Sequence, residues 1–187
     1  MTDESELDED APINRYVHGF SFPELMEGVE VDFILVRAVK DIENWGDCLV
    51  NMLAHEIAHQ EFYSKIDEMP ATNSGNIILE GHAMLTAEKV SEELGVDWKP
   101  HYRSDEEIDV EAGTIIELLD EDFKQSPEGI FRRGEEPCPD AEGYYIAYQV
   151  VKDILERTEL ELENLPRASD ERLRKEVEES IDRLLVN

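Results

Sequence analysis

The sequence His55-Glu56-Ile57-Ala58-His59 constrains this chain more than any other feature. Four residues complete slightly more than one turn of an α-helix, so both imidazoles leave the same face about one turn apart. Two imidazoles placed in this way can bind one Zn²⁺ with bonds of about 2.0–2.1 Å. Glu56 lies beside the first histidine, where a general base can take a proton from a zinc-bound water. The pattern predicts a zinc site and metal-assisted hydrolysis.

The residues around this motif favour a buried helix. The run from Cys48 to Ala54 is largely apolar, and Ile57 and Ala58 continue it inside the motif. The alternative is a solvated helix face that carries two incidental histidines. On a buried helix the histidines and Glu56 need partners, because an unpaired buried polar group costs about 2–7 kcal/mol. A zinc ion would be such a partner.

A catalytic zinc ion usually has three protein ligands and one open position. The candidates for the third ligand are Glu80, His82, Glu88 and His101. The helical neighbours of Glu80 are Ala83, Met84, Ala87 and Val90. This apolar stripe should face the core, so a carboxylate within it needs a cation or hydrogen-bond donors. His82 projects about 200° away from Glu80. Alternatively, Glu80 is only a negative charge near a helix N-terminus, where the helix dipole favours it. The histidines would then only pack in the core or face solvent.

Composition bounds the class of protein. The chain has 187 residues and a formal net charge of −30, with 47 acidic residues against 17 basic ones spread along the sequence. This distribution favours a protein from a salt-rich cytoplasm over an ordinary acidic protein, because salt screens the self-repulsion. The charge should repel nucleic acid and anionic membranes. We expect no nucleic-acid or membrane partner.

The sequence also bears on localisation. The segment from Met1 to Asp10 is acidic and lacks the basic and apolar regions of a secretory signal. Uncharged apolar runs such as Phe33 to Val36 are far too short to cross a bilayer. Cys48 and Cys138 are distant from each other and fit reduced intracellular thiols. We expect a soluble, cytoplasmic protein.

The chain should form one domain over residues 12–187 after a disordered acidic tail over residues 1–11. Hydrophobic patterning predicts a strand over residues 30–39 and helices over residues 45–67, 77–94, 109–123, 143–157 and 169–185. Gly95 is placed for a left-handed helix cap. The Pro- and Gly-rich stretch 124–142 is suited to a lid or substrate wall. The predicted class is mostly α, with a minor α+β character from the short β element before the motif helix.

Two further boxes carry a resemblance to a known family. Glu80-Gly81-His82-Ala83 looks like an E-G-x-A box, and Gly143-Tyr144-Tyr145-Ile146-Ala147-Tyr148 is similar to a G-Y-x-x-G-Y box, with Ala147 where glycine is usual. Together with the two histidines they resemble a gluzincin-like family of predicted zinc-dependent proteases, a domain of unknown function. The resemblance spans roughly residues 30–185.

This resemblance implies a zincin-like fold with His55, His59 and Glu80 as metal ligands and Glu56 as the general base. It also implies a peptidase that hydrolyses peptide bonds through a zinc-activated water. Some gluzincins carry an aspartate four residues after the ligand glutamate to orient a histidine. That position is Met84 here, so the orienting acceptor must come from elsewhere.

The oxyanion that develops during hydrolysis needs a second electrophile. Tyr144 and Tyr148 share one helix face and are our candidates, whereas Tyr145 fits a packing role. The alternative is that all three are core aromatics. For the whole chain, the alternatives are a zincin-fold protein that binds metal or a partner without hydrolysis, and a helical protein without metal. The substrate would be a peptide or protein, and the oligomeric state stays open.

Overall fold

The computed structural model describes residues 17–26, 29–38, 45–66, 70–98, 112–121 and 142–185. For the first two ranges, Trp45 and Glu142, it describes the backbone only. Several expectations lie outside the described residues. They concern the acidic tail over residues 1–11, nearly all of the stretch 124–142 with Cys138, and His101.

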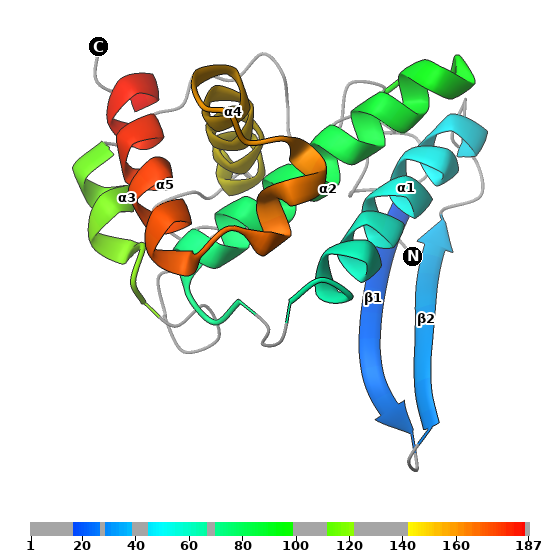
Figure 1. Ribbon diagram of the computed structural model, residues 1–187. Coiled ribbons are helices and arrows are strands. Elements are labelled where there is room, and N and C mark those ends of the chain that lie inside the picture. Colours follow the sequence, from blue (N-terminus) through cyan, green and yellow to red (C-terminus); the bar gives the residue numbers. More distant parts are fainter. Residues whose placement is uncertain are drawn as a thin grey trace, which may run out of the picture.

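The described part of the chain is mostly helical. The elements in chain order are β1 (Val17–Met26), β2 (Val29–Ala38), α1 (Trp45–Tyr63), α2 (Asn73–Leu94), α3 (Ala112–Leu118), α4 (Glu142–Arg157), the 3₁₀ helix η2 (Leu162–Arg167) and α5 (Asp170–Leu185). Figure 1 shows the helices gathered into one body beside a β-hairpin. None of the helices within the described ranges is both long and apolar enough to cross a membrane.

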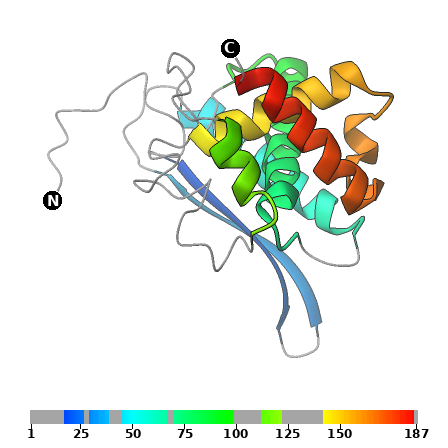
Figure 2. The same cartoon turned by 90° about the vertical axis from the view of Figure 1, so that its left-hand side faces the viewer.

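β1 and β2 form an antiparallel hairpin whose register runs from Val17 opposite Ala38 to Met26 opposite Val29. β2 lies where the sequence favours a strand, whereas β1 was not expected. Gly19 and Pro23 break the pattern of β1, but a proline is tolerated in a strand that has a neighbour on one side only. The hairpin packs against α1 and projects away from the helical body (Figures 1 and 2).

α2 is the central helix of the body. It packs against α1 on one side and against α4, η2 and α5 on the other, and α5 in turn contacts α3 and α4 (Figure 1). The buried side chains of these helices form one core; its fully enclosed members include Ile77, Ile115, Ile154, Leu165 and Ile181. The buried part of α2 is therefore held from both sides, which fixes its position relative to α1.

The helices α2 and α4 approach each other closely at Gly81. A Cβ atom added to Gly81 would lie 2.3 Å from the carbonyl oxygen of Ala147 and 2.5 Å from Cγ2 of Val151. Only a residue without a side chain fits this approach of one backbone to another. Gly81 therefore sets how Glu80, the residue before it, is held relative to α4.

The first turn of α2 corrects the sequence-based boundaries. The sequence predicted that this helix begins at residue 77, but α2 begins at Asn73. The Thr72 hydroxyl accepts a hydrogen bond from the Gly75 N–H, and the N–H groups of Asn73 and Ser74 donate to the carbonyls of Glu121 and Leu119. The turn that follows α3 thus satisfies donors that a helix start leaves unpaired.

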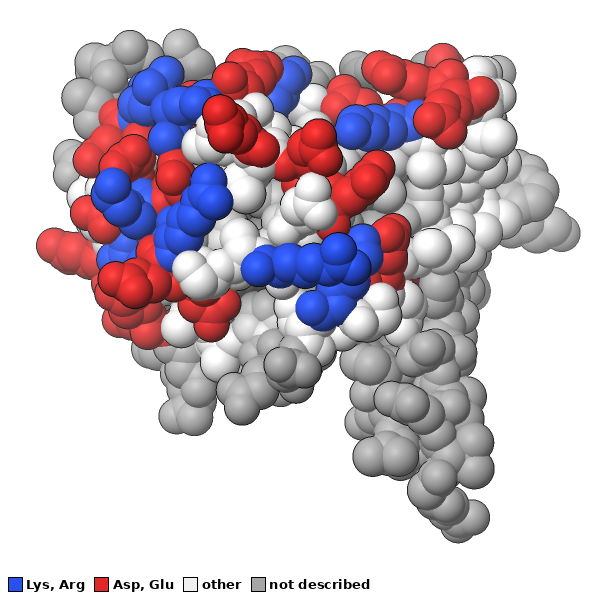
Figure 3. Space-filling model, in the orientation of Figure 1, with Lys and Arg blue, Asp and Glu red and all other residues white. Residues whose placement is uncertain are grey.

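Two helix ends differ from the expected bounds by four or five residues. α1 ends at Tyr63 rather than at residue 67, α3 ends at Leu118 rather than at residue 123, and η2 was not expected. Gly95 caps α2 with a φ of 66°, which confirms the predicted left-handed cap. α4 and α5 lie within one residue of their expected bounds. Figure 3 shows acidic and basic side chains interspersed over one face of the body.

Candidate metal centre

α1 and α2 bring three potential ligand atoms to one point. Nε2 of His55 lies 2.9 Å from Nε2 of His59. Oε2 of Glu80 lies 3.3 Å from the first nitrogen and 3.5 Å from the second. The two histidines come from one face of α1, one turn apart, and Glu80 reaches them from the neighbouring α2. Among the described residues, this is the group of three that can hold a metal ion.

The triangle formed by these atoms fits zinc. Tetrahedral zinc with bonds of about 2.0–2.2 Å places any two ligand atoms about 3.3–3.6 Å apart. The three observed distances of 2.9, 3.3 and 3.5 Å lie close to that value. Two imidazole lone pairs at such a separation repel each other unless a proton or a cation lies between them. Two neutral nitrogens and one carboxylate oxygen also match the donor set of catalytic zinc sites.

Burial makes this group dependent on a positive charge. His55 and His59 are only 3% and 6% exposed, and Oε2 of Glu80 is buried. Burial alone would raise the pKa of Glu80, but the charge and hydrogen bonds of His59 and His55 hold that pKa well below its usual range. Burial lowers the pKa of His55, with His59 adding to the effect. For His59, burial acts in the same direction, but the Glu80 carboxylate outweighs it and raises the pKa.

Glu56 follows His55 directly on α1. It is 5% exposed, and burial raises the pKa of its carboxyl to about 7, although His59 acts in the opposite direction. His59 and Glu80 both act on Glu56 electrostatically, so its carboxyl lies within the field of the group. A carboxyl whose pKa is near neutrality is suited to accept and return a proton.

The residue that would orient His59 is not among the described ones. Nδ1 of His59 is buried, and no described residue forms a hydrogen bond with it. Metal-binding histidines usually donate this second N–H to an acceptor. Met84, which stands where some gluzincins have an aspartate, is buried and offers only a weak sulfur acceptor.

The two described alternatives for the third ligand, His82 and Glu88, have other partners. His82 is 2% exposed, its ring lies edge-on to Phe62 with centroids 5.2 Å apart, and burial lowers its pKa to about 4. It is therefore a neutral packing residue and lies outside the metal-binding group. Both carboxylate oxygens of Glu88 lie 3.0 Å from the Tyr148 hydroxyl.

The segment from Gly143 to Tyr148, which we call the tyrosine box, packs α4 against α2. Tyr148 is buried, donates its hydroxyl hydrogen bond to Glu88 and stacks on Trp98 with centroids 5.4 Å apart. Glu88 lies eight residues after Glu80, about 12 Å further along α2. Tyr144 and Tyr145 are half-buried against the core. A role of Tyr144 or Tyr148 in catalysis stays a prediction.

Tyr63 is a site residue that the sequence analysis missed. Its ring stacks on His59 with centroids 6.1 Å apart and an interplanar angle of 18°. Burial raises the pKa of Tyr63, and the carboxylates of Glu80 and Glu56 raise it further. The available signal was its position, because Tyr63 follows His59 by four residues and so continues the face that carries both histidines.

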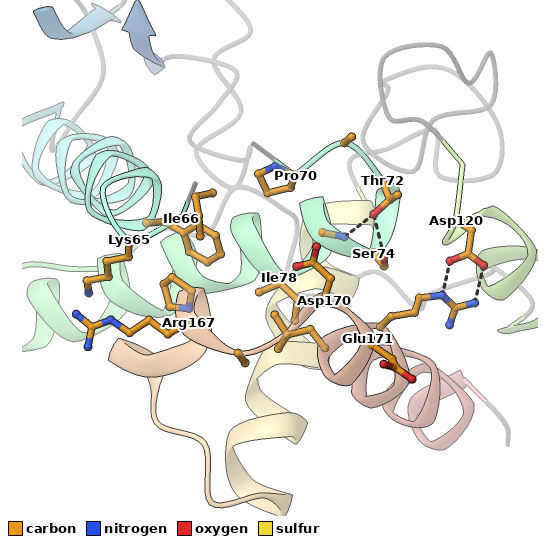
Figure 4. A pocket seen from close by; sticks show the side chains of 17 residues that line it. Lys65, Ile66, Pro70, Thr72, Ser74, Ile78, Asp120, Arg167, Asp170 and Glu171 are labelled. Carbon is orange, nitrogen blue, oxygen red and sulfur yellow. Dashed lines mark hydrogen bonds and ion pairs between the residues drawn. The ribbon is translucent and has the colours of Figure 1, made fainter. Parts of the chain in front are cut away.

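A separate cavity of about 910 Å³ lies between the end of α1, the start of α2 and the η2–α5 junction. Figure 4 shows Lys65 and Arg167 at one end of it and Asp120 at the other. Thr72 and Ile78 of α2 also line it, but His55, His59 and Glu80 do not. The cavity is therefore distinct from the metal-binding group, and charges of both signs line it.

Comparison with known proteins gives one family. The model of the family described as Predicted Zn-dependent protease (DUF2268) matches residues 21–175 of the 187. The chain belongs to this family. The matched segment includes α1, α2 and α4, and hence all three ligand atoms, Gly81 and the tyrosine box. No curated protein and no solved structure matches the chain significantly.

Proposed function

We propose that this member of the family is a zinc-dependent peptidase with a zincin-like fold. The observation that carries the proposal is the convergence of Nε2 of His55, Nε2 of His59 and Oε2 of Glu80 within 3.5 Å of one another. These three side chains would hold the ion. The family description supports a zinc-dependent protease.

The chain's own residues supply the rest of the reaction. A zinc ion in this position would lower the pKa of water and polarise a peptide carbonyl. Glu56 lies next to His55 and would accept the proton of the attacking water and return it to the leaving nitrogen. The near-neutral pKa of Glu56 suits both transfers. Burial of the two histidines keeps their orientation fixed while the substrate binds and leaves.

The substrate we propose is a peptide or protein. The formal charge of −30 disfavours nucleic acid and anionic membranes as partners. The same charge fits a cytoplasm with high salt, which is the localisation we propose. A non-catalytic zincin-fold protein that binds metal or a partner is the alternative, and the experiment below separates the two.

The test combines metal analysis with a cleavage assay. The zinc-loaded protein should contain one zinc per chain by mass spectrometry and should cleave peptides from a mixed library in molar KCl. Glu56→Gln should keep zinc and lower turnover by about 10²–10⁴-fold, because the amide preserves shape but cannot accept the proton. Glu61→Gln is the matched control, since Glu61 lies on the exposed side of the same helix and pairs with Lys65.

Each outcome is informative. Loss of turnover in Glu56→Gln with zinc retained supports the peptidase. Equal turnover in Glu56→Gln and the parent contradicts the role of Glu56. A parent protein that binds zinc stoichiometrically and cleaves no peptide in the library favours the non-catalytic alternative.

A further inference from the structure

The metal-binding group has a phenol on its border that the reaction described above does not use. Tyr63 lies one helical turn after His59 on α1, and the two rings stack nearly parallel with an interplanar angle of 18°. Because His59 is itself fixed by Glu80 and His55, this stacking fixes the plane of the Tyr63 ring next to a metal ligand. Tyr63 is therefore positioned by the same contacts that position the site.

The hydroxyl of Tyr63 is available. No described residue forms a hydrogen bond with it, and the side chain is half-buried rather than enclosed. Tyr148 offers a contrast, because its hydroxyl already lies 3.0 Å from both oxygens of Glu88. Of these two phenols, Tyr63 is the one that can donate a hydrogen bond to a bound molecule without giving up an existing one.

The surroundings of Tyr63 are those of the reaction site. The carboxylates of Glu56 and Glu80 both act on its hydroxyl. A tyrosine has an ordinary pKa of about 10, so the phenol is a neutral donor at physiological pH. A neutral donor can stabilise negative charge that develops on a carbonyl oxygen without repelling a nearby cation.

We propose that Tyr63 is a catalytic residue whose hydroxyl donates a hydrogen bond to the carbonyl oxygen of the scissile peptide bond. This inference rests on the proposed peptidase function. It assigns to the HExxH helix itself the electrophile that the sequence analysis sought in the tyrosine box. One helix then carries two metal ligands, the general base and the oxyanion donor.

The first measurement is steady-state kinetics of Tyr63→Phe on a peptide that the parent cleaves. The substitution removes the hydroxyl and keeps the ring that stacks on His59. We expect kcat to fall by about 10²-fold, with KM and zinc content nearly unchanged, because the lost hydrogen bond is stronger in the transition state than in the ground state. Tyr145→Phe is the matched control and should leave kcat unchanged. A fall in kcat for Tyr148→Phe with none for Tyr63→Phe would overturn the proposal.

The second measurement does not depend on turnover. A phosphinic peptide presents an anionic oxygen where the tetrahedral intermediate has one, and its dissociation constant for the zinc-loaded protein can be measured by calorimetry. We expect Tyr63→Phe to weaken binding by about 10–100-fold, since a hydrogen bond to a charged group is worth about 1.5–3 kcal/mol. Tyr145→Phe should bind as the parent does.

The two measurements separate the two proposals. If the parent binds the phosphinic peptide but cleaves no substrate, the peptidase function fails, and the loss of affinity in Tyr63→Phe still decides the role of the hydroxyl. If Tyr63→Phe matches the parent in affinity and in kcat, the role of Tyr63 is wrong while the peptidase stands. A parent that does not bind the phosphinic peptide overturns the inference about Tyr63.

Discussion

Two of the polar clusters between helices in the described part of this protein differ in how their charges are balanced. Between α4 and α5, the guanidinium of Arg157 donates to Glu176 at 2.6 Å, to Ser180 at 3.2 Å and to Asp153 at 3.4 Å. The Ser180 hydroxyl donates to Asp153 at 2.7 Å. We call these four residues the α4–α5 network. Its acidic groups have a resident cation within the chain.

The cluster between α1 and α2 has no lysine or arginine among its own members. His55, His59 and Glu80 direct two imidazole nitrogens and a carboxylate oxygen at one point. In the α4–α5 network each donor meets an acceptor, which is the pattern of a structural contact. In the metal-binding group two ring nitrogens and a carboxylate oxygen converge, and all three are acceptors when the imidazoles present their unprotonated nitrogens, which is the pattern of a site that binds a positive charge. The difference lies in the balance of donors and acceptors, because both clusters are shielded from solvent.

The largest expected effect is the loss of zinc when one of the three ligand side chains of the metal-binding group is removed. His59→Ala should lose stoichiometric zinc, because it removes one of the three donor atoms and leaves Glu80 with one imidazole. Arg157→Met should keep a full equivalent of zinc, since no atom of the α4–α5 network belongs to the metal-binding group. Metal analysis of both variants after dialysis against zinc and then against metal-free buffer checks this.

Thermal unfolding supplies a second readout for the same pair. A ligand at 100 times its Kd stabilises the folded state by about 2.7 kcal/mol if it does not bind the unfolded chain. EDTA should therefore lower the Tm of the zinc-loaded parent and of Arg157→Met. It should leave the Tm of His59→Ala unchanged. If His59→Ala retains zinc and its EDTA response, the ligand assignment is wrong.

The next effect concerns the α4–α5 network itself. Arg157→Met should lower the free energy of unfolding by about 2–4 kcal/mol, because it leaves the carboxylate of Glu176 without its cation and that of Asp153 with Arg183 alone, at 3.4 Å. Both side chains are only 16% exposed, so water compensates the loss in part. Urea unfolding of the parent and the variant measures this.

A double variant sharpens that result. Arg157→Met combined with Glu176→Leu removes a buried charge together with its partner, so it should recover part of the stability lost in Arg157→Met alone. If the two substitutions instead destabilise additively, the charges of the α4–α5 network do not interact as the distances indicate.

The sequence predicted the helical part of this fold well, because its signals are local. Leu173, Val177 and Ile181 recur at helical spacing, and all three are buried on α5 against the body. The start of α2 was missed because Asn73 and Ser74 have loop-forming side chains. They enter the helix because carbonyls in the turn that follows α3 accept their N–H groups, a contact between segments that patterning does not record.

The site residues also differ in whether local sequence or packing between helices determines their positions. The spacing of His55 and His59 is a property of one helix and could be predicted without knowing the fold. The approach of Glu80 depends on how α1 packs against α2, so the apolar stripe around it and the family resemblance were both needed. Tyr63 was missed because a tyrosine on an apolar helix face is ordinarily a core residue. Only the stacking on His59 and the unengaged hydroxyl distinguish it.

The helix α2 carries Glu80 of the metal-binding group, and α4 carries Arg157 of the α4–α5 network. The way in which these two helices cross therefore affects both clusters, and Gly81→Ala tests this. The added methyl would meet the backbone of Ala147 at 2.3 Å, and a helix backbone cannot yield as a side chain can. We expect a loss of about 1–3 kcal/mol of stability, with weaker zinc binding because Glu80 precedes Gly81. Gly113→Ala is the matched control, since its methyl would meet no atom within 4 Å and alanine favours a helix by about 0.5–1 kcal/mol. Equal stability of the two variants would mean that the crossing has room to relax.

The smallest effect should come from an ion pair that solvent reaches. Arg174 lies 2.6 Å from Asp120, the same distance that joins Arg157 to Glu176, but the Asp120 side chain is 75% exposed. Exposed pairs contribute about 0–1 kcal/mol, because water solvates both charges before they pair and salt screens them afterwards. Arg174→Met should therefore cost less than about 1 kcal/mol in dilute buffer.

In 1 M KCl, where the Debye length is about 3 Å, that cost should nearly vanish. The cost of Arg157→Met should persist, because the carboxylates that lose their partner there are shielded from the salt. Urea unfolding of both variants and the parent at low and high KCl measures the two differences. A cost for Arg174→Met that equals that of Arg157→Met in both salts would show that burial does not distinguish these pairs.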